Sequence, residues 1–485
     1  MILGLGIVAV GLRLGRLWLP GYRWLSGGDE LVYIQLSQGF LRGCGFARFL
    51  GTRCAPPEIL RVPGYPFFLA MCNSAALAAV SQAILGGLTT VVIGIVALQF
   101  WGVETALLAM LFAALDLPSI VLATMPWTEV IFTAIVTPAF ALQLYSLDSK
   151  SRHYSIYIMV ASCLLGVAAL IRPAGQIFLL QVIAAALMLD RSVYRRGILA
   201  IGSVVLVALP SAIWSVRNYK LAGLFGSSMT GQFTLYEVYG TDILSSLKLH
   251  TTRDTVEREA AIDKVGRQLG RELYDACCYD GRCRGLEHQF DWSERDPLPA
   301  TLPASCVREM QRRGLWLVAG HPLVFLALAV RHAIQNMMSR DKELVVGLFA
   351  PASLAKLDKA GPLPTERLLS AFGRRRGFEL ALAAESALLT LLWVGVFLAV
   401  MSLYDASKSD RKIVLLATST VLFYICVSAT VSASARFRIP VAPLLALASG
   451  WGWKNAGQLS LAWATSRKVR SSPSQSTVQS ESDEK

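Results

Sequence analysis

Blocks of about 20 apolar residues recur along the chain, and this repetition constrains the fold more than any other feature. A helix needs about 20 predominantly apolar residues to cross the hydrocarbon core of a bilayer. Hydrophobic residues make up 54% of the chain and charged residues only 16%, whereas soluble proteins carry about a quarter charged residues. These proportions exclude a purely soluble protein and predict an all-α polytopic membrane protein.

About ten transmembrane helices are expected from the positions of these blocks. The blocks occupy residues 1–19, 75–99, 105–122, 127–146, 155–171, 174–189, 197–215, 378–403, 413–433 and 440–453. A further apolar stretch, 315–329, is interrupted at residues 320–322 and closed by Arg331. The interruption favours an interfacial helix. A crossing by residues 315–338 would put the basic loop 408–412 and the basic tail outside, although it would place the basic residues 374–376 on the inner side.

Positive charge is distributed unevenly between the loops, and this predicts the orientation. With a cytosolic N-terminus, the inner side receives the basic loops at 150–152, 191–196 and 408–412 and the basic residues that follow position 453. Such an inward bias is what sets topology. The net charge of +13 therefore favours a role in topology and in contacts with anionic lipids or phosphates over nucleic-acid binding.

This orientation divides the chain into four regions. They are an N-terminal membrane module (1–215) with an outer loop at 20–74, an extracytosolic Cys-containing region with interfacial helices (216–377), a C-terminal set of membrane helices (378–453) and a disordered cytosolic tail (454–485). The first block lacks a basic lead and a small-residue cleavage site, so we expect a retained helix rather than a signal peptide. The absence of Asn-x-Ser/Thr sequons favours a bacterial inner membrane, with the outer loops in the periplasm.

The nine cysteines are divided between the two environments. Cys72, Cys163 and Cys426 lie in or beside spans, where a free, buried thiol is expected. The six cysteines of the outer loops are disulfide candidates for an oxidising compartment: Cys44, Cys54, Cys277, Cys278, Cys283 and Cys306. A zinc site with His288 is the alternative, but no CxxC pair with metal-ligand spacing is present, so we predict no metal site.

Three carboxylates on the outer side could carry acid–base chemistry. Asp29 and Glu30 follow two glycines and precede a short surface helix expected at 31–41. At such a helix start, backbone N–H groups and the helix dipole stabilise a negative charge. Glu129 follows Pro126 at the outer end of a span, where a carboxylate is costly without a partner or a wet cavity. The alternative for each of these carboxylates is that it only caps a helix.

Arginines lie at the same side of the membrane and could bind phosphate. They are Arg61, Arg172, Arg217, Arg436 and Arg438. The planar guanidinium suits bidentate phosphate binding in a low-dielectric site. Each alone could instead be an interfacial anchor whose charge reaches the lipid headgroups. Together with the carboxylates, they predict an outward-facing polar cavity that handles a phosphate-bearing lipid.

The motifs containing these residues resemble, in the same order, those of the GT-C class of lipid-linked-sugar-dependent glycosyltransferases. This class contains the protein O-mannosyltransferases and the lipid A aminoarabinose transferases. The matching motifs are Gly28-Asp29-Glu30 with Tyr33, Arg61–Pro66, Thr128-Glu129, Arg172-Pro173, Ile213–Tyr219 and Arg436–Pro440. The resemblance covers roughly residues 1–240 and 307–453, and the segment at 243–306 departs from it.

The resemblance implies an inverting glycosyltransferase that uses a sugar linked to polyprenyl phosphate. It implies that Asp29 acts as the base, with Glu30 and Glu129 orienting the acceptor, while Arg61, Arg217, Arg436 and Arg438, and less so Arg172, bind the donor phosphate. The motif residues Tyr33, Tyr65, Asn218 and Tyr219 would line the substrate cavity. The acceptor would be a hydroxyl of a protein, of lipid A or of a cell-envelope glycan. No cofactor is implied, because a monophosphate donor does not require a divalent metal.

Two other functions fit the same helices. A transporter or flippase for a polyprenyl-linked saccharide would also need membrane helices and phosphate-binding arginines. However, transport sites lie near the bilayer midplane on helices related by internal repeats, whereas these motifs cluster at one face. A structural subunit of a polysaccharide assembly complex would keep the spans without needing the carboxylates. The sequence favours the enzyme over both.

Overall fold

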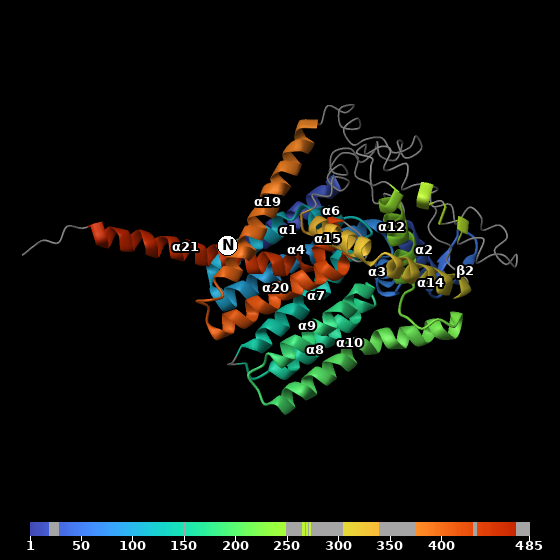
Figure 1. Ribbon diagram of the computed structural model, residues 1–485, viewed down its shortest axis with the longest axis horizontal. Coiled ribbons are helices and arrows are strands. Elements are labelled where there is room, and N and C mark those ends of the chain that lie inside the picture. Colours follow the sequence, from blue (N-terminus) through green and yellow to red (C-terminus); the bar gives the residue numbers. More distant parts are fainter. Residues whose placement is uncertain are drawn as a thin grey trace, which may run out of the picture.

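The computed structural model of the protein describes residues 1–18, 29–148, 151–248, 264–266, 268–269, 271–272, 304–338, 375–429 and 434–471 (Figure 1). Nearly all of the secondary structure in these residues is helical. The exception is one antiparallel pair of short strands, β1 (Ala47–Phe49) and β2 (Cys54–Pro57). The prediction of an all-α membrane protein is therefore confirmed.

Each of the ten apolar blocks coincides with one helix or with two consecutive helices. These are α1 (Ile2–Gly15), α4 (Ala75–Trp101), α5 (Val103–Leu115) with α6 (Leu117–Leu122), α7 (Thr128–Leu147), α8 (Tyr154–Ala169), η2 (Pro173–Ile177) with α9 (Phe178–Leu187), α10 (Val193–Ala222), α19 (Arg375–Met401), α20 (Lys408–Ser428) and α21 (Ala442–Ser471). Five of the described helices, α4, α7, α10, α19 and α20, are long and apolar enough to cross a membrane. The count of ten spans stays a prediction.

Capping side chains and one glycine define where these helices start and stop. Asp116 accepts a hydrogen bond from the Ser119 backbone N–H at 3.1 Å and so caps α6. Ser74 caps α4 in the same way through the Leu77 N–H, at 3.0 Å. Gly102 separates α4 from α5 with φ of 86°, a left-handed conformation that favours glycine.

The structure extends α21 beyond its apolar block. Residues 454–471 were expected to belong to the disordered tail, yet α21 continues to Ser471. This segment contains Ala, Leu, Lys and Arg, which are good helix formers and let the helix continue past the apolar core. Residues 472–485, the rest of the expected tail, lie outside the described residues.

The basic loops lie together at one end of the bundle. Asp190 pairs with Lys408 at 3.1 Å and with Lys412 at 2.7 Å. Arg191 donates to the backbone carbonyl of Ser151 at 3.2 Å. Three loops that the charge distribution assigned to the same side of the membrane are thus in contact.

The opposite end carries the short elements of the two long loops. These are α2 (Asp29–Leu41), the β1–β2 hairpin, α3 (Gly64–Cys72), α11 (Thr230–Phe233), η3 (Thr234–Val238), α12 (Tyr239–Lys248) and α14 (Ala304–Gly320). Figure 1 shows α2, α3, β2, α12 and α14 gathered there. Helix α2 confirms the short helix expected at 31–41, whereas α3 was not expected. Its nine residues end at Cys72, and the next residue, Asn73, has a φ of 49° that turns the chain towards α4.

The interrupted apolar stretch at 315–329 forms parts of two helices. Helix α14 ends at Gly320 and α15 (Pro322–Met338) starts two residues later, with 97° between their axes. Pro322 lacks the N–H that a continuous helix would need at this position. The break confirms that the stretch is not one straight helix, and whether it crosses the membrane stays a prediction.

Small residues bring the membrane helices close together. A Cβ on Gly452 of α21 would lie 2.0 Å from the Gly395 carbonyl oxygen of α19, and one on Gly450 would lie 2.9 Å from the Ala109 nitrogen of α5. Small residues at helix crossings let backbones approach, which replaces the hydrophobic driving force that is weak within lipid. The close crossings thus favour one packed bundle over separate helices.

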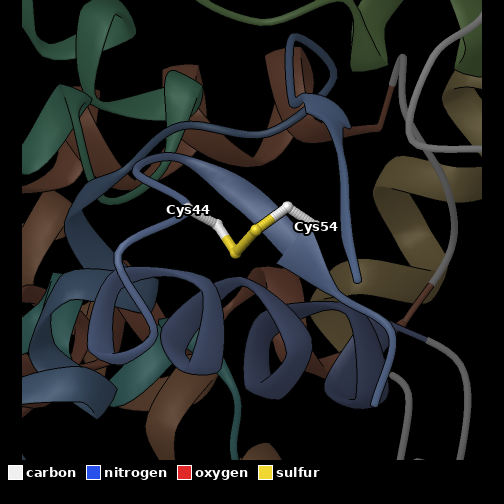
Figure 2. Close-up of a disulfide and its surroundings, with 2 residues drawn as sticks. All are labelled: Cys44 and Cys54. Atoms are coloured by element: carbon white, nitrogen blue, oxygen red, sulfur yellow. A yellow bond between two sulfur atoms is a disulfide. The ribbon is translucent and has the colours of Figure 1, made fainter. Parts of the chain in front are cut away.

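A disulfide joins Cys44 and Cys54, as Figure 2 shows, and bridges the turn after α2 to the first residue of β2. Cys306 is also disulfide-bonded, whereas Cys277, Cys278 and Cys283 lie outside the described residues. Cys72, Cys163 and Cys426 are free, but they are not buried as expected: Cys72 is partly exposed, and Cys163 and Cys426 lie exposed on the surface of their helices. The prediction is confirmed for the pair in the first loop.

The pairing can be measured by counting thiols. Wild-type protein denatured in detergent should gain two more maleimide-reactive thiols on reduction than a Cys44→Ser/Cys54→Ser variant gains, because only the wild type carries this disulfide. Labelling followed by intact mass measurement gives both counts. An equal gain in the two proteins would contradict the pairing.

Candidate functional site

Asp29 and Arg61 form an ion pair at the end of the bundle that carries α2. Asp29 is the first residue of α2, where the helix dipole adds to the stabilisation of its negative charge. The Asp29 side chain is 37% exposed, whereas that of Arg61 is 15% exposed. Arg61 also donates to the Thr230 hydroxyl at 3.0 Å. The pair therefore leaves a stabilised carboxylate that solvent or a substrate can reach.

A set of hydrogen bonds fixes the loop that carries Arg61. The Leu60 carbonyl accepts from the hydroxyls of Ser228 and Thr230, at 2.5 and 2.7 Å. The Leu60 N–H donates to the Glu58 carboxylate at 2.7 Å, and Glu58 lies 3.5 Å from Arg48. Burial raises the pKa of Glu58, and the positive charge of Arg48 opposes that shift. Arg61 is thus held by contacts to the second long loop.

Glu129 and Arg172 form a second ion pair, with 2.5 Å between Oε1 and Nη1. Glu129 is the second residue of α7, and Arg172 directly precedes η2. Their side chains are 1% and 13% exposed, so this pair is much more buried than the first. A buried carboxylate needs such a partner, because an unpaired charge in a low-dielectric interior is costly.

Tyr33 lies within electrostatic reach of both ion pairs. It is one helical turn after Asp29 on α2, and the charges of Asp29, Arg61, Glu129 and Arg172 all act on its hydroxyl. Burial, followed by the negative charge of Asp29, raises the pKa of Tyr33 to about 12. The phenol is therefore a neutral hydrogen-bond donor at pH 7, and the two ion pairs belong to one site.

The neighbouring residue Tyr65 supports Tyr33 from α3. The two rings meet edge to face with centroids 5.1 Å apart. The Tyr65 hydroxyl donates to the Gln82 amide oxygen at 2.8 Å, and the Gln82 amide group donates to the Met125 carbonyl at 2.8 Å. Tyr65 is fully buried, so its ring packs against Tyr33 from the interior of the bundle.

A chain of aromatic and charged side chains extends from Glu30 to Arg172. The Trp127 indole N–H donates to the Glu30 carboxylate, which is fully buried. The Arg436 guanidinium lies 4.8 Å from the Trp127 ring and 5.1 Å from the Phe437 ring. The Arg172 guanidinium lies 5.3 Å from the same Phe437 ring. Glu30 thus positions Trp127 rather than facing an open cavity, and Arg436 lies close to the second ion pair.

Arg217 lies at the β1–β2 hairpin instead of this site. It donates to the carbonyls of Glu58 and Phe46 and stacks 4.8 Å from the Trp214 ring. Asn218 accepts from Arg217 at 2.9 Å and donates to the Gly226 carbonyl at 2.8 Å. Tyr219 is 59% exposed. These contacts tie α10 to the first outer loop, so a phosphate contact by Arg217 stays a prediction that the geometry does not favour.

Arg438 is buried and bound to two carboxylates. It lies 3.1 Å from Glu385 of α19 and 3.7 Å from Asp116, the cap of α6. It also donates to the Met337 carbonyl at 3.3 Å. These contacts fix the segment that carries Arg436, whereas none of the ion pairs among the described residues involves Arg436 itself. Of the arginines singled out in the sequence, Arg436 is thus the best placed to meet a ligand anion.

Several residues in or near this arrangement were not singled out in the sequence, among them Trp127, Glu385 and Tyr424, whose phenol lies within electrostatic reach of Arg172. Trp127 stands in the motif around Glu129, where only the carboxylate drew attention. Glu385 and Tyr424 lie inside apolar blocks, and an ionisable group within a span is itself a signal of function or pairing. The described ranges contain no group of three or more His, Cys, Asp or Glu side chains that could hold a metal ion.

The buried ion pair gives a stability prediction. Replacing Arg172 by Ala should lower the free energy of unfolding by about 3–5 kcal/mol, because it leaves the Glu129 carboxylate buried without its cation. A second substitution, Glu129→Gln, should restore part of the loss because it removes the unpaired charge. Unfolding in mixed detergent micelles measures both effects.

The matched control is the exposed pair Arg312–Glu309, whose Arg312 side chain is 75% exposed. Exposed pairs contribute little to stability, so Arg312→Ala should leave unfolding nearly unchanged. Equal effects of Arg172→Ala and Arg312→Ala would show that the Glu129–Arg172 pair is not the constraint inferred here.

Two solved structures show a distant similarity to this chain. The oligosaccharyltransferase AglB of Archaeoglobus fulgidus, in complex with an inhibitory peptide and a dolichol-phosphate, has 12% identity and a TM-score of 0.48; the match covers 96% of this chain and 51% of AglB. ArnT of Cupriavidus metallidurans, bound to undecaprenyl phosphate, has 13% identity and a TM-score of 0.38, with 94% and 78% covered. The chain thus spans about half the length of AglB.

No protein-family model and no curated protein matches the sequence. At TM-scores below 0.5, the structural similarities carry no argument about function, so that argument rests on the residues of the site. What the two comparisons establish is that the chain is similar in structure, at low identity, to an archaeal oligosaccharyltransferase and to ArnT.

Proposed function

We propose that this protein is an integral membrane glycosyltransferase. It moves a sugar from a polyprenyl-phosphate donor to an acceptor hydroxyl at the extracytosolic face, with inversion at the anomeric carbon. The single observation that carries this proposal is the convergence of the Asp29–Arg61 and Glu129–Arg172 pairs on Tyr33, at the end of the bundle opposite the basic loops.

Asp29 is the base in this proposal. Among the carboxylates of the site it is the most exposed, at 37%, whereas Glu30 and Glu129 are buried. An acceptor hydroxyl can therefore reach Asp29 but not the other two. Arg61 and the α2 dipole stabilise its negative charge and hold the carboxylate in place at the exposed end of the site.

The leaving group is a phosphate and needs cations rather than an acid. When the bond between the anomeric carbon and the phosphate oxygen breaks, both electrons leave with the phosphate. Arg436 and Arg172 flank the Phe437 ring and can stabilise that charge in a water-poor site. The acceptor oxygen attacks the anomeric carbon from the face opposite the phosphate, while its proton passes to Asp29. The new bond thus forms on the face opposite to the bond that breaks. This geometry gives inversion.

The carboxylates that are not exposed have supporting roles. Glu30 holds Trp127, and the Trp127 ring holds the Arg436 guanidinium. Glu129 orients Arg172, while Glu385 and Asp116 fix Arg438 and hence the segment around Arg436. Arg217 fixes the hairpin. The prediction that several arginines bind the donor phosphate is thereby narrowed to Arg436 and Arg172.

Loss of the base gives the first functional prediction. Asp29→Asn should lower sugar transfer by about 10²–10⁴-fold, because the amide keeps the size of the side chain but cannot accept the proton. The measurement is sugar release from radiolabelled polyprenyl-phosphate donors by the purified full chain in lipid nanodiscs. Asp190→Asn, the same change at the basic end of the bundle, is the matched control and should keep wild-type release.

Three outcomes contradict parts of this proposal. Full activity of Asp29→Asn would remove Asp29 as the base. Equal loss in Asp29→Asn and Asp190→Asn would indicate a general effect of charge removal. Movement of the donor across the bilayer without sugar release would replace the enzyme by a flippase.

The two classes of arginine give the second functional prediction. Arg436→Gln should weaken binding of the donor by roughly tenfold, because it removes a cation from the leaving phosphate, and should leave the melting temperature close to that of the wild type. Arg217→Gln should lower the melting temperature instead, because it breaks the contacts to the hairpin carbonyls. Donor titrations and thermal melts of both variants test this division, which a reversed pattern would overturn.

A further inference from the structure

Tyr424 of α20 lies beside the buried ion pair of the proposed site. The charges of Arg172 and Glu129 both act on its phenol, and its side chain is fully buried. Its ring stacks on the Phe178 ring with centroids 5.1 Å apart and 3° between the planes. The stack on Phe178, six residues after Arg172 in the chain, and the surrounding core hold the ring in place, within electrostatic reach of Arg172 and Glu129.

The hydroxyl of Tyr424 differs from those of the other fully buried tyrosines. Tyr65 donates to the Gln82 amide, Tyr236 to the Leu269 carbonyl and Tyr239 to the Ala429 carbonyl. Among the residues that the structure describes, the Tyr424 hydroxyl has no hydrogen-bond partner. A buried hydroxyl without a partner is unfavourable for folding alone. A tyrosine that only filled this space would serve equally well as phenylalanine.

The chemistry of the surroundings indicates what the hydroxyl binds. A neutral phenol donates one hydrogen bond, and Arg172 beside it supplies a positive charge. Arg436, which lies against the same Phe437 ring as Arg172, adds a second cation. A phosphate oxygen carries negative charge and only accepts hydrogen bonds, so it complements both the phenol and the cations.

We propose that Tyr424 donates a hydrogen bond to the phosphate of the lipid-linked donor and, with Arg172, forms the anion-binding part of the site. This inference rests on the proposed function and deepens it by adding a phosphate ligand that lies within an apolar block. The residue binds both the donor and the prenyl phosphate that remains after transfer. It binds the prenyl phosphate group and not the acceptor.

Binding of a soluble prenyl phosphate tests this directly, without requiring turnover. The full chain in lipid nanodiscs is titrated with farnesyl phosphate and, separately, with farnesol, which has the same chain without the charge. Tyr424→Phe should weaken farnesyl phosphate binding by about tenfold, because a hydrogen bond to a charged group is lost. Its affinity for farnesol should equal that of the wild type.

Thermal melts of the same samples separate this role from a structural one. Tyr424→Phe should melt at or above the wild-type temperature, because it removes a buried hydroxyl that has no protein partner. Tyr236→Phe is the matched control, since it deletes the buried hydroxyl that donates to Leu269 at 3.1 Å. It should melt below the wild type and bind farnesyl phosphate normally.

Each outcome decides between the two proposals. Weaker farnesyl phosphate binding in Tyr424→Phe alone, without a lower melting temperature, supports the inference. Unchanged binding in that variant overturns the role of Tyr424 and leaves the glycosyltransferase proposal standing. A lower melting temperature with unchanged binding assigns the hydroxyl a structural role. A wild type that binds farnesyl phosphate no better than farnesol overturns the lipid-phosphate donor and, with it, both proposals.

Discussion

Pairing of buried charge is the constraint on which the rest of this structure depends. A guanidinium in a membrane-embedded bundle must find a carboxylate or a carbonyl, because an unpaired charge there is costly. Arg438 meets Glu385 and Asp116 and so joins α19 and the start of α6 to the segment before α21. Arg13 of α1 donates to the Ala113 carbonyl near the end of α5 at 3.3 Å. These contacts fix the relative positions of helices that also pack closely, as α19 and α21 do at Gly395 and Gly452, and the outer loops are connected to that frame.

Local patterns predicted the local parts of this arrangement. The run of apolar residues located the helices, the two glycines before Asp29 indicated a helix start, and the position of Cys44 and Cys54 in an outer loop marked both as disulfide candidates. Charge asymmetry placed three basic loops on one side, and the contacts of Asp190 with Lys408 and Lys412 agree. Each of these signals depends on residues close in sequence or on a property summed over a whole loop.

The sequence could not predict which arginines have structural partners and which are left to bind a ligand, because those partners lie far away in the sequence. Arg217, Arg436 and Arg438 look alike as cations beside aromatic or apolar neighbours. In the folded chain, Arg438 pairs with the carboxylates of Asp116 and Glu385. Arg217 donates to carbonyls beside the hairpin, and Arg436 lies against two aromatic rings. Tyr424 was hidden for the same reason, since within an apolar block a tyrosine is indistinguishable from a core aromatic until its neighbours are known.

Exposure then decides what each ion pair can do. Asp29–Arg61 and Glu129–Arg172 have the same chemistry, yet the carboxylates are 37% and 1% exposed. In the proposed mechanism, the exposed Asp29 carboxylate can release Arg61 and accept a proton from the substrate. The buried Glu129 carboxylate would lose more free energy on leaving Arg172 than a contact with the substrate would return. In that mechanism, Arg61 therefore stabilises the base and Glu129 positions a cation for the donor phosphate. The first pair would present its anion to the acceptor hydroxyl and the second its cation to the phosphate, which is the polarity that the proposed transfer requires.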